Sequence, residues 1–508
     1  MEEHLYMGVD LGTSFIKTAV YDISGKQYAA ANEPVADERP APGVFLQHGE
    51  QIFESVCRCI KKTAGKLAGD AGRIAAIAFT GQMAGSMGVD EEWRDITTWS
   101  CSLDSRYFPY SRRQLEKYGD DIYRLSGTSS PVMCGKYEWF AKEFPGQAEK
   151  IAKYVMLNGY MIGKLSGIET NEAAIDYSLL AWTGMADIRR GCWSNEICSK
   201  LGMPEALLPR IGAGTDIGGY LSEKEALRLG LPSGIPLILG AGDKVAGCIG
   251  AGISHDGDKI FEASSYAALS VQVDDFRPDT EQKEFDIIGS IRRERFYVHK
   301  YLQGSGITLD WFINEFVLRD GETSSAAFKR IEKMAAEVPA GSDHMLAVGL
   351  LGGSAMPFQP DQKGLFFGHT WSHGKGHFYR SLLEGFTYEL AGLLDRVDTI
   401  YPEYAGGVIR LIGGGAHSAV WPQIMADVTG RSFAVLSRDD VALWGTALLA
   451  ALAVGDVSDI AAAADAAVGV SVLYTPDSGR TAAYRPYIEQ YSALRRELQG
   501  YYASLGKI

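Results

Sequence analysis

The chain has 508 residues, of which 46% are hydrophobic and 22% are charged, and these values exclude a disordered chain because they match ordinary globular proteins. At roughly 150 residues per domain, this length favours two or three domains over one. The 49 Lys and Arg residues are outnumbered by 63 Asp and Glu residues, and the resulting net charge of −14 argues against binding to nucleic acid or anionic lipid, which both need a basic surface.

The seven cysteines indicate thiols in a reducing compartment, because no Cys-x-x-Cys pair suggests a zinc site or a redox dithiol. Residues 1–4 are acidic and lack the basic and apolar pattern of a signal peptide. The most apolar segment, 442–455, is too short to span a bilayer. We therefore expect a soluble, cytoplasmic protein with no membrane contact.

The first half of the chain predicts strands that alternate with helices. Strands are expected at 5–10 and 15–21, joined by a tight turn at 12–14, and a helix at 51–67 precedes a strand at 74–79. The later elements of this half are helices at 120–125, 136–143, 147–164 and 245–251, and a strand at 237–240. This order indicates a mixed α/β layer fold.

The second half repeats the plan of the opening, because residues 259–271 again read as strand, small-residue turn and strand. This weak internal repeat predicts that a second domain of similar design begins near residue 253. The remaining elements are expected to be helices at 307–316, 324–337, 377–401, 419–429, 442–453, 458–472 and 484–505, a strand at 408–412, and a Gly-rich loop at 349–357.

The first candidate for chemistry is the segment Asp10-Leu11-Gly12-Thr13-Ser14, which is followed by Lys17. Such a turn presents backbone N–H groups and hydroxyls to an oxyanion, and the carboxylate beside it can hold a hydrated Mg²⁺. Lys17 could reach a phosphate. An ordinary β-hairpin with a polar turn explains the same residues equally well.

Two other turns follow apolar strands. Asp243 ends the segment Gly240-Ala241-Gly242-Asp243 and is placed either to bind a ligand at the carboxyl end of a strand or to cap the next helix. The glycines 413–415 would let a flat ligand approach the backbone, or they form a plain tight turn. They are no dinucleotide fingerprint, because Ser418 stands where that motif needs glycine.

Other nucleotide and hydrolase motifs are absent from the sequence. It contains no Walker A loop, no His-Glu-x-x-His and no Gly-x-Ser-x-Gly. Zinc hydrolysis and serine esterase chemistry therefore have no motif support.

The order of the motifs is more specific than any one of them. In chain order they are Asp10-x-Gly-Thr-Ser, Thr80-Gly81-Gln82-Met83, Asp104-Ser105-Arg106, Gly240-Ala241-Gly242-Asp243, Ser264-Ser265 and Gly413-Gly414-Gly415-Ala416. This order resembles the FGGY carbohydrate kinases, the family that contains xylulokinase, glycerol kinase, ribulokinase and gluconate kinase. Segments 136–143 and 364–384 are similar to the two signatures of the family, with departures at His369 and Leu382.

The resemblance implies two actin-like, ribonuclease H-like domains with a cleft between them, and transfer of the γ-phosphoryl group of ATP to a sugar or polyol hydroxyl. It places an N-terminal domain at 1–252, a C-terminal domain at 253–483 and a last helix at 484–508. A homodimer is a further expectation at the level of the family.

The resemblance also implies roles for individual residues. Asp243 would be the general base, and Asp10 would hold Mg²⁺ through water. The acceptor would contact Gln82, Met83, Asp104 and Asp243. The residues expected to bind ATP are Gly12, Thr13, Ser14, Lys17, Ser264, Ser265, Gly306, Gly414, Gly415 and Ala416.

Several residues depart from the xylulokinase pattern and bear on the choice of acceptor. Ala84 stands where His usually follows Met, Ser102 stands where Trp is usual, and Ala263 replaces the glycine of the second phosphate turn. The loop 352–357 lacks its usual charged pair. We expect a ketose such as a pentulose, with another polyol, a hexulose or a sugar acid as alternatives.

Two other functional classes share parts of this pattern. One is a sugar-binding regulator of the same fold that has lost catalysis. The altered turn at Ala263 and the missing charged pair in the loop 352–357 are the reasons to consider it. The other is an actin-fold ATPase that works as a chaperone or a filament subunit, although the chain leaves no residues for a peptide-binding domain.

Overall fold

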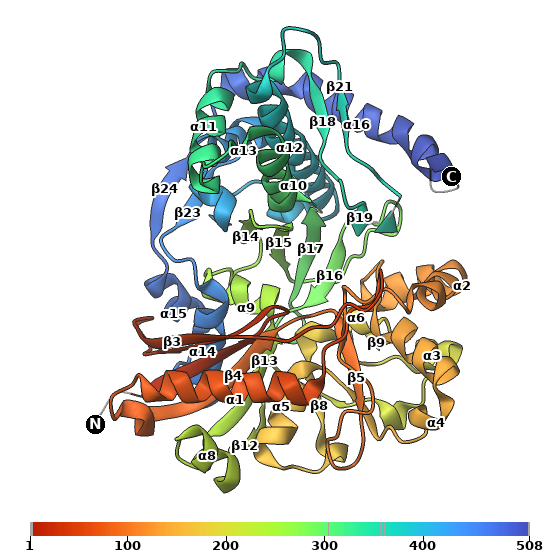
Figure 1. Ribbon diagram of the computed structural model, residues 1–508, viewed down its shortest axis with the longest axis vertical. Coiled ribbons are helices and arrows are strands. Elements are labelled where there is room, and N and C mark those ends of the chain that lie inside the picture. The colour runs from red at the N-terminus through yellow and green to blue at the C-terminus, as the bar shows by residue number, and fades with distance from the viewer. Residues whose placement is uncertain (1–3, 303, 356–357, 360, 506–508) are drawn as a thin grey trace.

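The computed structural model of the protein describes residues 4–302, 304–355, 358–359 and 361–505, and it contains two large β-sheets with helices around them (Figure 1). Residues 1–3 of the acidic N-terminus, residues 356–357 of the predicted Gly-rich loop and the end of the predicted last segment lie outside the described residues.

The first sheet has six strands in the order β12-β13-β4-β1-β2-β3. Their bounds are β1 Leu5–Leu11, β2 Phe15–Tyr21, β3 Gln27–Pro34, β4 Ile74–Gly81, β12 Ile217–Tyr220 and β13 Pro236–Gly242. Strand β1 is antiparallel to β2 and parallel to β4, which is parallel to β13. The carboxyl ends of β1, β4 and β13 therefore meet at one edge of the sheet.

The second sheet has seven strands in the order β16-β17-β15-β14-β22-β23-β24. Their bounds are β14 Lys259–Glu262, β15 Ala267–Val273, β16 Asp286–Gly289, β17 Phe296–Leu302, β22 Ile409–Ile412, β23 Phe433–Leu436 and β24 Val470–Tyr474. Strand β14 is antiparallel to β15 and parallel to β22, as β1 is to β2 and β4. The predicted internal repeat is thus confirmed at the level of topology.

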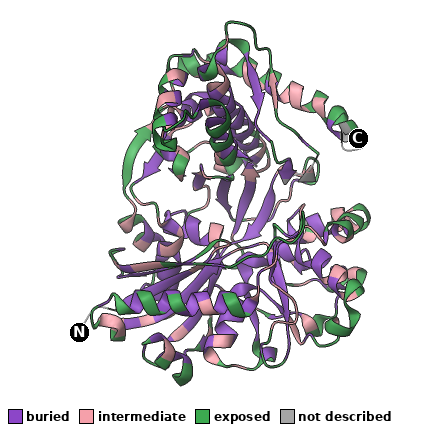
Figure 2. Cartoon of the chain, in the orientation of Figure 1, coloured by how far each residue is buried: buried purple, intermediate pink, exposed green. Residues whose placement is uncertain are grey.

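Helices cover both sheets, and buried residues gather inside them (Figure 2). Helices of the first half are α1 Gly49–Gly65, α2 Phe108–Ser126, α3 Met133–Glu143, α4 Pro145–Ala148, α5 Leu157–Ser166, α6 Leu180–Thr183, α7 Asn195–Leu201, α8 Glu223–Leu229 and α9 Asp243–Gly250. Those of the second half are α10 Ser305–Phe312, α11 Ser324–Ala336, α12 Lys375–Ile400, α13 Trp421–Thr429, α14 Val441–Ala453, α15 Ile460–Ala467 and α16 Ser478–Leu505.

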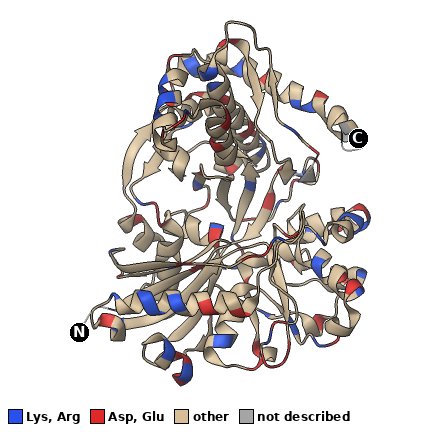
Figure 3. Ribbon diagram, in the orientation of Figure 1, with Lys and Arg blue, Asp and Glu red and all other residues tan. Residues whose placement is uncertain are grey.

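The remaining β-strands of the described part of the chain are short. They are β5 Gly85–Val89, β6 Ser100–Cys101, β7 Lys153–Val155, β8 Ala174–Asp176, β9 Ala186–Asp187, β10 Cys192–Trp193, β11 Arg210–Gly212, β18 Leu346–Val348, β19 Ser354–Ala355, β20 Phe358–Gln359 and β21 Leu365–Phe367. Figure 3 shows Lys and Arg mixed with Asp and Glu along outer helices such as α1, as expected for solvated faces.

Two predicted helices are wrong. The segment 147–164 contains strand β7, because Lys153–Val155 pairs with β5, and helix α5 begins only after it. The segment 458–472 holds helix α15 and the start of β24, which pairs with β23. In both places pairing with a distant strand overrides the local helical pattern.

Helix α14 comes late in the chain but packs on the first sheet, against β1 and β4, and on helix α9. Close approach explains the small residues at this junction. A Cβ atom on Gly250 would lie 1.8 Å from the carbonyl oxygen of Val441, and one on Gly445 would lie 2.0 Å from that of Ala246. Both positions therefore need glycine.

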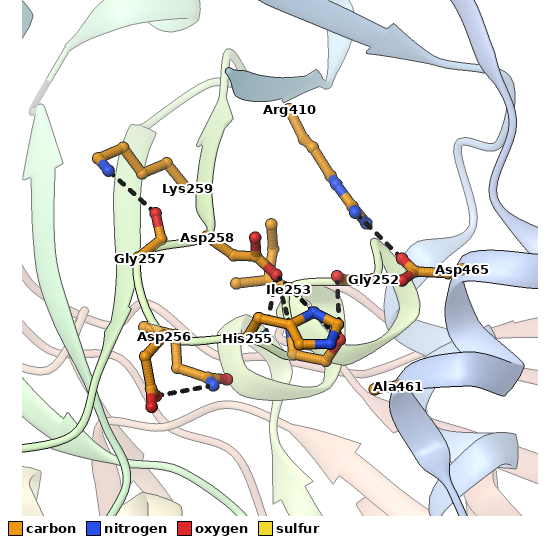
Figure 4. Close-up of polar contacts among 12 residues, drawn as sticks. Gly252, Ile253, His255, Asp256, Gly257, Asp258, Lys259, Arg410, Ala461 and Asp465 are labelled. Atoms are coloured by element: carbon orange, nitrogen blue, oxygen red, sulfur yellow. Dashed lines mark hydrogen bonds and ion pairs between the residues drawn. The ribbon is translucent and has the colours of Figure 1, made fainter. Parts of the chain in front are cut away.

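The segment between α9 and β14 carries the chain from the first sheet to the second, and its own side chains and Arg410 fix its path (Figure 4). Arg410 of β22 donates to the carbonyl of Ala251 and, at 3.0 Å, to Asp465 of α15. The carboxylate of Asp258 accepts the N–H groups of Ser254 and His255 at 3.1 and 2.9 Å.

A second set of contacts joins the end of α2 to strand β16. Thr128 donates to the buried Asp286 at 2.7 Å, and the N–H of Ile287 donates to the carbonyl of Gly127 at 2.8 Å. The end of α2 thus adds a connection between the two halves of the chain. None of the helices in the described part of the chain combines the length and the apolar character that crossing a bilayer requires.

Candidate active site

Three of the predicted motifs meet at the shared carboxyl edge of β1, β4 and β13. The register places Leu11 opposite Gly81, and Gly81 opposite Gly242. The turn at residues 12–14, the segment after Gly81 and the start of α9 are therefore neighbours. This is the edge at which ligands bind in open α/β sheets.

Asp243 is the first residue of helix α9, and Gly242 occupies the cap position. The alternative reading of Asp243 as a helix cap is therefore wrong. Burial raises the pKa of Asp243, the charge of Lys244 lowers it, and the charge of Glu262 raises it further. Such a carboxylate holds a proton better than one in water, as a general base requires.

Gly242 is enclosed on two sides, and this fixes the backbone before Asp243. Its N–H donates to the hydroxyl of Ser178 at 2.9 Å. A Cβ atom at this position would lie 2.6 Å from Cγ of Met83. The structure thus brings Met83, one of the residues expected to bind the acceptor, against the segment that carries Asp243.

Asp10 belongs to the same group of charges. Burial raises its pKa to about 7, the charge of Asp243 raises it as well, and Lys17 and Lys244 lower it. Two carboxylates that repel one another in a desolvated place fit a divalent cation. Within the described residues, no three His, Cys, Asp or Glu side chains are grouped to hold a metal ion. The donor set fits Mg²⁺, which takes one or two carboxylates together with phosphates and water.

Segments distant in sequence form hydrogen bonds with the turn at residues 12–14. The carbonyl of Thr13 accepts the side-chain N–H of Gln47 at 2.8 Å, and the carbonyl of Ser14 accepts the N–H of Val35 at 2.9 Å. Lys17 lies opposite Asp10 on β2.

The other residues expected to bind ATP gather around the turn that follows β14. The carbonyl of Ala263 accepts the N–H of Gly415 at 2.8 Å, and the carbonyl of Ser264 accepts the N–H of Gly306 at 3.1 Å. A Cβ atom on Gly306 would lie 2.8 Å from the Ser264 carbonyl oxygen, and one on Gly415 would lie 2.7 Å from Cβ of Ala263. These glycines let three segments pack together.

Gln82 and Asp104 are connected through one short segment. Gln82 accepts the indole N–H of Trp99 at 3.2 Å, and its Nε2 is buried without a partner among the described residues. The next residue, Ser100, donates to Asp104 at 2.7 Å. Residues 99 and 100 therefore link the two residues that we expected to contact the acceptor.

Asp104 is fully buried, and both of its oxygens are engaged. Arg106 donates to them through two bonds of 2.8 Å and stacks over the ring of Trp139 at 4.6 Å. Burial opposes ionisation of Asp104, but the bonds from Arg106 and Ser100 outweigh it and lower the pKa.

A cavity of about 230 Å³ lies beside this pair. Polar and aromatic residues line it, among them Ser86, Ser100, Arg106, Lys136, Trp139 and Tyr154. Burial lowers the pKa of Lys136 to about 7, while its amine donates to the carbonyls of Ser100 and Cys101.

Two charged residues of this region were missed in the sequence. Nζ of Lys244 lies 2.6 Å from Oε2 of Glu262 and 5.9 Å from the ring centroid of Tyr301. The internal repeat could have identified Glu262, because it ends β14 next to a small-residue turn, much as Asp10 stands near the end of β1. Lys244 carries no sequence signal beyond its place after Asp243.

Comparison with known proteins agrees with this geometry. The family model for the N-terminal domain of the FGGY family of carbohydrate kinases matches residues 5–250, and the model for the C-terminal domain matches residues 278–454. The chain therefore belongs to the FGGY family of carbohydrate kinases and is an ATP-dependent carbohydrate kinase. The predicted boundary after residue 252 falls between the two matched ranges and stays a prediction.

Relatives named gluconokinase and xylulose kinase are equally similar to this chain. The chain is 26% identical to a gluconokinase of Bacillus subtilis, over 98% of this chain and 97% of that protein. It is also 26% identical to a xylulose kinase of Bacillus subtilis, over 96% of this chain and 95% of that protein.

Solved structures confirm the predicted two-domain α/β fold. A gluconate kinase from Lactobacillus acidophilus matches with a TM-score of 0.90 at 21% identity, over 99% of this chain and all of that one. A ligand-bound xylulose kinase from Lactobacillus acidophilus matches with a TM-score of 0.88 at 21% identity over the same shares.

Proposed function

We propose that the protein transfers the γ-phosphoryl group of ATP to a hydroxyl of a small carbohydrate, with Asp243 as the general base and Mg²⁺ as the metal ion. The observation that carries this proposal is the position of Asp243. It stands at the carboxyl edge of the first sheet, its charge raises the pKa of Asp10, and burial raises its own pKa. A reaction at this edge needs a group that accepts the proton of the attacking hydroxyl.

In this proposal, different residues of the chain bind the acceptor, the phosphates and the metal ion. Asp243 orients the acceptor hydroxyl and takes its proton as the new bond to phosphorus forms. The turn at 12–14 and Lys17 bind phosphate oxygens from the first sheet, and Ser264 and Ser265 do so from the second. Bound Mg²⁺ would supply positive charge to the phosphates, and Asp10 would hold it through water.

The adenosine would lie against the junction of Gly306, Gly414, Gly415 and Ala416. Gly414 supports this assignment, because a Cβ atom there would meet nothing within 4 Å, so the surface beside it is open to a ligand. Ala416 is buried, so it would contribute to the packing beneath this surface and would not contact the adenosine directly.

We propose a ketose, with a pentulose first, as the acceptor. The apolar Met83 against Gly242 and the Trp99–Gln82 contact are suited to a small polyhydroxy chain with one apolar face. A sugar acid is the second candidate, because the gluconokinase and xylulose kinase relatives are equally similar to this chain.

A coupled assay of ADP release with Mg-ATP tests the proposal over a panel of pentuloses, hexuloses, polyols and sugar acids. We expect one acceptor to give strong turnover. If no compound of the panel causes ADP release while the protein still binds ATP, the result would favour a sugar-binding regulator instead.

The base is tested by Asp243→Asn, which should abolish transfer while ATP binding persists. A matched control is Asp216→Asn, which removes a carboxylate that accepts the N–H of Ala213 at 2.9 Å in a turn of the same half. Normal turnover of Asp243→Asn would overturn the assignment. A cytoplasmic location and a homodimer remain predictions.

A further inference from the structure

Lys244 carries a positive charge beside the proposed base, and it lies outside the motifs that the chain shares with its family. It follows Asp243 directly on α9, and its ammonium contacts Glu262 at the end of β14 with an N–O distance of 2.6 Å. The ion pair therefore joins the first sheet's helix to the second sheet. The Lys244 and Glu262 side chains keep 18% and 27% of their surface exposed, so a ligand can reach them.

The charges around this ammonium are mostly negative. Asp10, Asp243 and Glu262 all act on the same region, and the positive charges of Lys17 and Lys244 partly compensate them. A γ-phosphoryl group that enters between Asp243 and the turn after β14 brings further negative charge. The ammonium of Lys244 offsets part of the repulsion between this charge and the acidic residues.

The ion pair with Glu262 holds the ammonium of Lys244 near the turn that follows β14. Residue 262 directly precedes the turn at 263–265, which is expected to bind phosphate, and residue 244 directly follows the proposed base. The ion pair therefore connects the segment of the proposed base with the turn that is expected to bind phosphate.

We propose that Lys244 contacts the phosphoryl group during its transfer, and that Glu262 is the partner that holds the ammonium in place before the nucleotide arrives. This inference rests on the proposed function. In the transfer step, the bond between the γ-phosphorus and the β–γ bridging oxygen breaks, and a bond to the acceptor oxygen forms. The acceptor proton goes to Asp243, and Lys244 keeps its protons and stabilises the charge on the phosphoryl oxygens.

A purely structural role is the competing explanation, because an ion pair between two elements can position them. The two explanations differ in the expected behaviour of Glu262. If the ion pair only joins α9 to β14, removal of either charge has the same effect. If Lys244 contacts phosphate, loss of Glu262 leaves the ammonium free for the nucleotide.

The test compares Lys244→Met, Lys244→Arg and Glu262→Gln in the full-length protein. Titration calorimetry with Mg²⁺ measures the affinity for ADP and for the non-hydrolysable ATP analogue AMP-PNP, without acceptor. We expect Lys244→Met to weaken AMP-PNP about tenfold and ADP less than about twofold, because only AMP-PNP carries the third phosphate. Glu262→Gln should bind AMP-PNP more tightly than the parent protein does.

Turnover with the acceptor found in the panel gives the second readout. Lys244→Met should lower kcat by about a hundredfold or more and change the KM of the acceptor less than about threefold. Lys244→Arg should recover a large part of kcat. An ion pair elsewhere supplies the control: Lys300→Met removes the pair with Glu284 and should leave the ratio of the two nucleotide affinities unchanged.

Equal losses of AMP-PNP affinity and kcat in Lys244→Met and Glu262→Gln would overturn the proposal in favour of a structural bridge. An unchanged affinity ratio in Lys244→Met would overturn it as well. If no acceptor is phosphorylated but AMP-PNP binding still depends on Lys244, the proposed function fails and the phosphate contact stands. If neither nucleotide binds the parent protein, both fail.

Discussion

The hydroxyl of Ser178 accepts a hydrogen bond of 2.9 Å from the backbone N–H of Gly242, the residue before the proposed base. Ser178 donates in turn to Asp176, whose carboxyl group also accepts the Ser178 N–H at 3.0 Å. Burial raises the pKa of Asp176 to about 7. A short buried segment outside the first sheet thus fixes the backbone at the point where β13 becomes α9.

The first prediction concerns Ser178→Ala, which leaves the Gly242 N–H without its acceptor. We expect kcat to fall about tenfold, because Asp243 loses part of its orientation. The free energy of unfolding should fall by about 1–3 kcal/mol, since a buried donor becomes unpaired. Steady-state kinetics and urea unfolding measure the two effects.

Ser126→Ala is the matched control. Ser126 is equally buried, and its hydroxyl donates to the carbonyl of Ala186 at 2.7 Å, away from the carboxyl edge of the first sheet. It should lose a similar free energy of unfolding and keep its kcat. Equal kinetic losses in both variants would show that Ser178 contributes only to stability.

The sequence predicted those parts of the site that depend on residues close together in the chain. The turns at 12–14 and 413–415 and the position of Asp243 follow from strand ends and small residues. The Ser178–Gly242 bond and the Lys244–Glu262 pair could not be predicted, because each joins segments that only the folded sheets bring together.

The same reason explains the errors in secondary structure. Residues 153–155 read as part of a helix in their local pattern, but they extend to pair with Met87–Val89 of β5. The order of motifs succeeded where single motifs were ambiguous, because it reflects the order of strands in two similar sheets.

Asp104→Asn tests the acceptor side of the site. The change removes the charge that binds Arg106 through two bonds and weakens the link through Ser100 to the Trp99–Gln82 contact. We expect the KM of the acceptor to rise about tenfold or more, with a smaller effect on kcat, because binding and not chemistry is disturbed. Initial rates over a range of acceptor concentrations measure both constants.

Asp37→Asn provides the comparison, because Asp37 accepts from Arg39 at 2.9 Å on the surface. An exposed ion pair of this kind contributes little, so both kinetic constants should stay unchanged. If Asp104→Asn lowered kcat alone, Asp104 would act in the chemical step and the assignment to acceptor binding would be wrong.

Lys136 predicts a dependence of stability on pH. Its pKa falls from 10.5 in the unfolded chain to about 7 in the fold because of burial. Between these two values the unfolded state binds the additional proton, so the contribution of Lys136 to stability rises with pH from about 7 to 10.5 and is constant below 7. The largest slope for one proton is about 1.4 kcal/mol per pH unit.

Lys136→Met should remove this slope. Urea unfolding at pH 7, 8 and 9 measures it as the difference between the parent protein and the variant, so that all other titrating groups cancel. Lys142→Met is the control, because Lys142 is exposed and pairs with Glu138 on the surface of α3. Parallel stability curves for the parent protein and Lys136→Met would contradict the lowered pKa.

The last prediction concerns the segment that connects the two sheets. Gly252 has φ of +75°, and a Cβ atom there would lie 1.9 Å from Nη1 of Arg410 and 2.7 Å from Oδ1 of Asp465. Gly252→Ala therefore combines backbone strain with displacement of the guanidinium from Ala251. We expect the free energy of unfolding to fall by about 3 kcal/mol or more, since strain alone costs about 1–2 kcal/mol.

Gly230→Ala separates the two causes. Gly230 has φ of +73° at the end of α8, and a Cβ atom there would meet nothing within 4 Å. This variant carries the backbone strain without the clash, so it should lose only about 1–2 kcal/mol in the same urea titration. If the two variants lost equal free energy, Arg410 would move aside at no cost, and its bonds to Ala251 and Asp465 would not hold the connection between the sheets.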